Sequence, residues 1–165
     1  MQYLLSVAIG PVQEFIASAR RSRDLWFGSW LLSELAKTVA KVIGKENLVF
    51  PSIQKDADLQ EGSPFNVVNK IVAIIETDDP HKYGTELEAQ VRTRLTQLRT
   101  DAFHNIAKQD SYLEANAIAQ IDDLVEFYWS AVPLNGNYTQ ARQDAERLLA
   151  ARKNTRDFAA VTWAS

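Results

Sequence analysis

IGPVQEFIASARRSRDLWFGSWLLSEL, residues 9–35, is the stretch that decides the fold of this 165-residue chain. It follows an apolar run at residues 3–8 and opens with Gly10 and Pro11. This pattern predicts a strand that passes through a tight turn into a helix, because glycine tolerates turn dihedrals and proline presets φ at the first helical position. A strand end, a helix N-terminus and nearby basic residues together suit a nucleotide phosphate, so the turn is a candidate ligand rim.

The same stretch predicts two helices rather than one. The polar run at residues 20–24 interrupts the helical spacing of apolar side chains, which resumes at Leu25 or Trp26 and continues to Ile43. Asp24 is the expected N-cap of the second helix, and Gly44 is placed to end it in a left-handed conformation.

The rest of the chain predicts three more strands and three more helical segments. The strands are expected at residues 47–51, 69–76 and 126–132, and the helical segments at residues 80–108, 111–122 and 139–153. The simplest architecture for this order is a ferredoxin-like α+β fold, an antiparallel sheet with helices on one face. We expect a Palm-like domain over residues 1–134 and a helical extension, the start of a following domain, over residues 135–165.

Composition excludes several functional classes. The net charge is −3, so a nucleic-acid contact would need a local basic patch rather than the surface as a whole. The absence of cysteine excludes disulfides, thiolate metal sites and a cysteine nucleophile, and only two histidines are present. No apolar run approaches the roughly 18–20 residues of a membrane span, and no signal peptide is recognisable, so we expect a cytoplasmic protein with no membrane contact.

Six segments, in order, resemble a known family: IGPVQEFI, SARRSRDLWFGSWLLSEL, LVFPS, VVNKIVAII, FYWSAVPL and LAARKNTRDF. The chain resembles the first Palm (nucleotide-cyclase-like) domain of the large subunit of type III-B (Cmr-type) CRISPR effector complexes. The resemblance covers nearly the whole chain. It implies a part in an RNA-guided antiviral interference complex, with other effector subunits, guide RNA and target RNA as partners.

The resemblance also implies a nucleotide chemistry that this chain would share with a second Palm domain. In the family, ATP binds between two Palm domains and is converted to cyclic oligoadenylate, and a GGDD hairpin of the second domain holds Mg²⁺ or Mn²⁺. The present sequence has no GGDD segment and no His-Asp dipeptide of an HD nuclease. Gly10 and Pro11 also stand where an active cyclase would offer a metal-binding aspartate. We therefore expect no catalytic residue and no metal ligand here.

Candidate nucleotide-binding residues follow from the turn and from the family pattern. Gly10, Pro11, Val12 and Gln13 are expected to line a nucleotide pocket through the backbone and the Gln13 amide, although a purely structural turn is the alternative. The resemblance places Gly28 and Ser29 next to the adenine base of the nucleotide, where the serine hydroxyl can form a hydrogen bond with the edge of the ring. The alternative is that the two small residues serve close helix packing. Arg20 and Arg23 are candidates for phosphate or RNA contact, or are ordinary solvated helix charges.

Two rival hypotheses involve no nucleotide binding by this domain. In the first, the domain is a docking module for neighbouring subunits and guide RNA, with exposed tryptophan and arginine residues as interface anchors. Trp26, Trp30 and Trp129 are expected in the core or at such an interface, with base stacking as the alternative for each. The second rival is an independent ferredoxin-like RNA-binding domain.

Overall fold

The structure is a computed structural model, and it describes residues 1–104, 118–122 and 124–155. The elements are β1 (Gln2–Gly10), α1 (Val12–Ser18), α2 (Ser22–Ile43), β2 (Leu48–Phe50), β3 (Lys70–Glu76), α3 (Pro80–His104), β4 (Glu126–Pro133) and α5 (Tyr138–Asn154), with 3₁₀ turns at Lys45–Asn47 and Asp56–Leu59.

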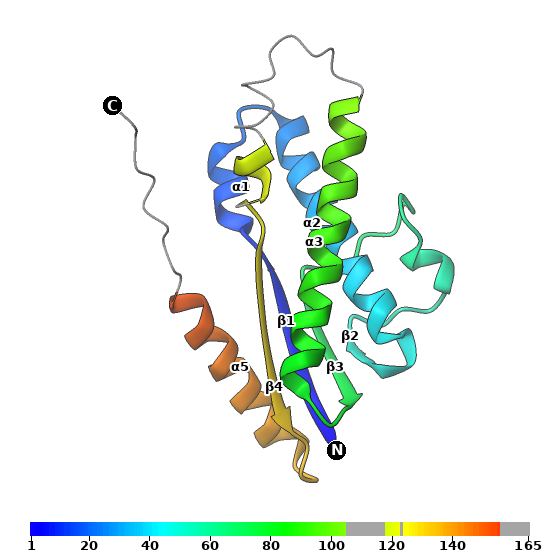
Figure 1. Cartoon of the computed structure of the whole chain (residues 1–165), viewed down its shortest axis with the longest axis vertical. Helices are drawn as coiled ribbons and strands as arrows, with labels where there is room; N and C mark the ends of the chain where they lie inside the picture. Colours follow the sequence, from blue (N-terminus) through cyan, green and yellow to red (C-terminus); the bar gives the residue numbers. More distant parts are fainter. Residues whose placement is uncertain (105–117, 123, 156–165) are drawn as a thin grey trace.

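The four strands form one antiparallel sheet in the order β2-β3-β1-β4, which is the order of a ferredoxin-like fold (Figure 1). The central strand β1 pairs on one side with β3 and on the other with β4, so that Tyr3 lies opposite both Ile75 and Pro133. The predicted α+β class and antiparallel sheet are therefore confirmed. β2 is shorter than predicted, with three residues at the edge of the sheet.

Alternate residues of β1 enter two different apolar layers, because successive side chains of a strand point to opposite faces. Leu5, Val7 and Ile9 belong to the main core with α2 and α3. Leu4 belongs to a smaller cluster with Ala141 and Ala145 of α5, which lies on the other side of the strands (Figure 1). The predicted helical extension thus begins with a helix that covers the second face, while the domain boundary at residue 134 stays a prediction.

The polar run at residues 20–24 separates α1 from α2 as predicted, but Asp24 is not the N-cap. α2 begins at Ser22, and Asp24 is its third residue. Its Oδ2 atom accepts hydrogen bonds from the backbone N–H groups of Arg20 and Arg21 at 3.2 and 3.0 Å. The carboxylate therefore reaches backward to N–H groups that have no helical partner.

Gly44 ends α2 as predicted, and its backbone N–H donates to the carbonyl oxygen of Ala40 at 3.0 Å. Its φ of 85° is positive, but its ψ of 133° lies outside the left-handed helical region. Pro11 was expected at the first helical position. It instead precedes α1 as the N-cap, in an extended conformation with φ of −85° and ψ of 135°.

α3 begins at Pro80 as predicted and packs closely on β4 through Gly84. A Cβ atom at this glycine would overlap the indole ring of Trp129, so only glycine allows the observed approach of helix to strand. The predicted continuation of this helix to residue 108 and most of the helical segment predicted at 111–122 lie outside the described residues. Residues 118–122 are helical.

Candidate functional site

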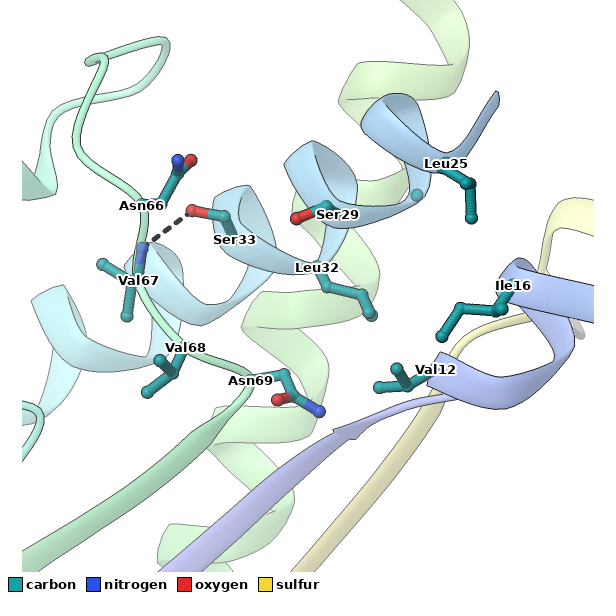
Figure 2. A pocket seen from close by; sticks show the side chains of 11 residues that line it. Val12, Ile16, Leu25, Ser29, Leu32, Ser33, Asn66, Val67, Val68 and Asn69 are labelled. Carbon is teal, nitrogen blue, oxygen red and sulfur yellow. Dashed lines mark hydrogen bonds between the residues drawn. The ribbon is translucent and has the colours of Figure 1, made fainter. Parts of the chain in front are cut away.

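An apolar hollow lies beside the end of β1, between α1, α2 and the segment at residues 66–69 that leads into β3. We call it the α1–α2 hollow; its volume is about 380 Å³. Figure 2 shows the side chains of Val12, Ile16 and Leu32 pointing toward one another across it. Its lining is completed by Leu25, Gly28, Ser29, Ser33, Asn66, Val67, Val68 and Asn69. Both Gly28 and Ser29 therefore lie where a ligand in this hollow would touch them.

Hydrogen bonds to α2 and β1 hold the wall of the hollow that residues 66–69 form. The Ser33 hydroxyl accepts from the Val67 backbone N–H at 2.9 Å (Figure 2). Asn69 donates from its side-chain Nδ2 to the backbone carbonyl oxygen of Ile9 at 2.9 Å. Its backbone carbonyl oxygen accepts from the backbone N–H of Ile9, also at 2.9 Å. Ser33 and Asn69 thus position the wall, and the Ser29 hydroxyl and the Asn66 amide are the polar groups suited to meet a ligand.

A second hollow, of about 320 Å³, adjoins the first at Val12 and Asn69, which line both. We call it the strand-end hollow. Gly10, Pro11, Val12 and Gln13 line it as a group, and its other lining residues are Ala8, Ile9, Asn69, Glu126, Tyr128 and Lys153. The structure therefore places the six predicted nucleotide-binding residues around two adjoining hollows.

Gly10 allows the Glu126 side chain to lie close to the backbone at the end of β1. A Cβ atom at this position would lie 3.3 Å from Oε2 of Glu126, closer than most side-chain contacts. The glycine thus makes room for the Glu126 carboxyl, and both Glu126 and Lys153 line the strand-end hollow. A carboxylate and an ammonium group in the same lining leave the hollow with mixed charge, which is less favourable to a phosphate than the basic turn that the sequence predicts.

The two predicted arginines lie outside both hollows. Arg20 and Arg23 are exposed, and Nε of Arg23 is 3.8 Å from Oδ1 of Asp24. Exposed ion pairs of this kind add little stability, so the two guanidinium groups are available to a partner. Their predicted contact with phosphate or RNA stays a prediction.

The three tryptophans that were singled out occupy three different environments. Trp129 belongs to the main core, and Trp30 is half-buried against the same core. Trp26 is 67% exposed. Its ring stacks on Trp30 with centroids 6.4 Å apart and planes 15° apart, and the Phe27 ring, tilted by 32°, has its centroid 5.8 Å from that of Trp30.

An ionic cluster of Glu34, Lys37, Arg94 and Glu61 joins α2, α3 and the loop after Asp56–Leu59; its first three members are largely buried, and Glu61 is exposed. The Glu34 carboxylate accepts from Lys37 Nζ at 2.6 Å, from Arg94 at 3.3 Å and from the backbone N–H of Gly62 at 3.1 Å. Burial raises the pKa of the Glu34 carboxyl, but these hydrogen bonds outweigh burial, and the pKa lies below its usual value of 4.5. The cluster therefore anchors the loop that leads to the wall of the α1–α2 hollow.

Sequence reasoning missed Asn66, Asn69 and Glu34. Asn66 lies in a loop where no periodicity indicates the direction of a side chain, and Asn69, predicted as the first residue of a strand, directly precedes β3. Glu34 and Lys37 interrupt the apolar run of Leu31, Leu32 and Leu35. Two opposite charges three residues apart on a buried helix face were the available signal of a buried ion pair.

The described residues also lack two kinds of feature. They contain no group of three or more histidine, aspartate and glutamate side chains that could hold a metal ion. Among the helices that the structure describes, none is both long enough and apolar enough to cross a lipid bilayer.

The sheet order and the hollows beside the end of its central strand define the chain as a ferredoxin-like α+β domain with a candidate ligand pocket. Comparison with known proteins identifies the family within this fold class. The chain belongs to the family described as CRISPR-associated protein Cmr2, N-terminal, whose model matches residues 4–108.

A relative from Pyrococcus furiosus, named CRISPR system Cmr subunit Cmr2, is 33% identical over 113 residues. The match takes in 60% of this chain and 13% of the relative. The chain therefore corresponds to a small part of that protein.

Proposed function

We propose that this chain acts as the N-terminal Palm-like domain of the large subunit of a type III-B CRISPR interference complex and contributes to ATP binding there. The α1–α2 hollow would receive the adenine base, and a second, GGDD-bearing Palm domain would complete the site for cyclic oligoadenylate synthesis. Two findings support the proposal: membership of the Cmr2 N-terminal family, and an open hollow lined by Gly28 and Ser29.

The hollow suits a base better than a phosphate. Its walls are mostly aliphatic, and the Ser29 hydroxyl and the Asn66 amide offer a donor and acceptors for the edge of an adenine ring. Among the described residues no charged side chain lines it, so the triphosphate would need cations from outside this part of the hollow. In this proposal the second Palm domain holds Mg²⁺ or Mn²⁺.

Ser29→Tyr is expected to weaken ATP binding by the full-length large subunit about tenfold or more, because the phenol ring fills the space proposed for the base. Isothermal titration with ATP measures the effect. Ser52→Tyr is the matched control: it makes the same change at an exposed serine that lines neither hollow, and should leave the affinity unchanged. ATP binding equal to wild type in both variants would show that the base lies elsewhere.

One observation favours docking as a second function. α2 carries exposed aromatic side chains that the core does not use, among them Trp26 and Phe27. The relative is by name a subunit, and we propose that this domain likewise contacts neighbouring protein subunits, guide RNA or target RNA in a complex. This function does not require ATP to bind the α1–α2 hollow.

A further inference from the structure

The first half of α2 carries an aromatic stripe made of Trp26, Phe27 and Trp30, of which Trp30 packs against the main core and the other two are exposed. At 100° per residue, these three positions share one face with Arg23, which precedes them by three, four and seven residues. The core positions Leu32 and Leu35 lie on another side of the helix and are buried, and the buried Leu31 borders the stripe. Trp26 and Phe27 are 67% and 51% exposed, so two of the three rings offer their surfaces to solvent.

The rings are held in place before any partner arrives. Trp30 is anchored against the main core and contacts both neighbouring rings, and Trp26 lies nearly parallel to it. A fixed, flat aromatic surface loses little conformational entropy on binding, which favours stacking of another planar group on it.

Positive charge gathers at one end of the stripe, although the chain as a whole carries −3. Arg20, Arg21 and Arg23 are all exposed. Asp24 is the acidic residue among them, and its carboxylate is occupied by the backbone N–H groups of Arg20 and Arg21. Residues 20–24 therefore carry a net charge of +2, and Arg23 lies on the same helix face as the rings.

We propose that the aromatic stripe is a stacking platform for a single-stranded nucleic acid, with bases on Trp26 and Phe27 and phosphates on Arg20, Arg21 and Arg23. Aromatic faces flanked by arginine are the combination by which proteins bind single strands without reading their sequence. This inference rests on the docking function proposed above and names its partner. It is separate from the ATP proposal, because neither Trp26 nor Phe27 lines the α1–α2 hollow.

A protein partner is the alternative, because tryptophan, phenylalanine and arginine are also enriched at protein interfaces. The local excess of positive charge beside exposed rings favours the nucleic acid, and salt dependence distinguishes the two partners. Binding should therefore depend on both kinds of residue and fall as salt rises.

The test is fluorescence anisotropy of a labelled oligouridylate of about ten nucleotides, titrated at low salt with the full 165-residue chain. Trp26→Ala is expected to weaken binding at least about fivefold, and Phe27→Ala to weaken it in the same direction. Phe50→Ala is the matched control, since Phe50 is 47% exposed on β2 and away from the stripe, and it should bind as wild type.

Arginine variants test the phosphate contacts separately. Arg23→Ala should reduce the slope of log affinity against log salt by about 0.7, the value for one phosphate contact on a single strand. Arg147→Ala should leave the slope unchanged; its side chain is 77% exposed and paired with Asp144, much as Arg23 is 75% exposed and paired with Asp24.

Two outcomes would overturn the inference. Equal oligonucleotide binding by Trp26→Ala and Phe50→Ala would show that the stripe is not the platform. If Trp26→Ala instead weakens capture of a neighbouring protein subunit and leaves oligonucleotide binding intact, docking stands and its partner is a protein. Failure of the Ser29→Tyr test affects neither result.

Discussion

Replacing Glu34 by alanine is expected to lower the free energy of unfolding by about 3–5 kcal/mol, because it leaves the buried Lys37 ammonium and the Arg94 guanidinium without their shared carboxylate. Glu34 is 1% exposed and Lys37 3%, so water cannot replace the lost partner. The backbone N–H of Gly62 also loses its acceptor. Urea denaturation followed by circular dichroism measures the change.

Glu61→Ala is the matched control for this prediction. Glu61 pairs with the same arginine at 2.9 Å, but its side chain is 63% exposed. Loss of an exposed ion pair costs at most about 1 kcal/mol. Equal destabilisation by Glu34→Ala and Glu61→Ala would contradict a role for burial in the cluster.

The same carboxylate predicts a pH dependence. The pKa of Glu34 is lower in the folded chain than its ordinary value of 4.5, so the unfolded chain takes up the proton first as the pH falls. Its contribution to stability is therefore complete above about pH 4.5 and is lost as the pH falls through the folded pKa. Glu34→Gln should make the free energy of unfolding less dependent on pH in this acidic range. An unchanged acid profile in that variant would assign the pH dependence to other carboxyl groups.

Gly84→Val is expected to lower the free energy of unfolding by about 3 kcal/mol. Any Cβ atom at this position meets the indole of Trp129, a rigid ring in the main core. Helix propensity alone predicts the opposite sign, since glycine is among the poorest helix formers. Thermal denaturation therefore separates packing from propensity.

Two further variants locate the cause. Thr85→Val places the same side chain one residue along, on the exposed face of α3, and should change stability little. In a Trp129→Leu background, Gly84→Val should cost less than in the wild-type chain, because a smaller partner relieves the overlap. A cost independent of residue 129 would place the strain in the helix itself.

Strands were the most predictable part of this fold. β1, β3 and β4 consist of runs of apolar and β-branched residues with polar or turn residues at their ends. The predicted strand ends therefore agree with the observed ones to within one or two residues. The start of α2 was predicted wrongly because an aspartate can accept backbone N–H groups either ahead of it or behind it, and both choices give the same local sequence.

The candidate site was predictable only where one stretch of chain forms it. Gly28 and Ser29 follow from the family pattern on a single helix, and the structure places them at a hollow. Asn66 and Asn69 come from a loop more than thirty residues away, and only the pairing of β1 with β3 brings them there. Long-range contacts of this kind leave no trace in local periodicity.

The position of β1 at the centre of the sheet also sets the order of events during synthesis. Its partners end at Glu76 and Pro133, so Tyr3 leaves the ribosome well before either of the residues that face it. At 5–20 residues per second, the wait for Pro133 is about 7 to 26 seconds. β1 is thus translated before both of its partners, and the edge that faces β4 stays unpaired until that strand emerges, so its apolar side chains are exposed while the chain grows.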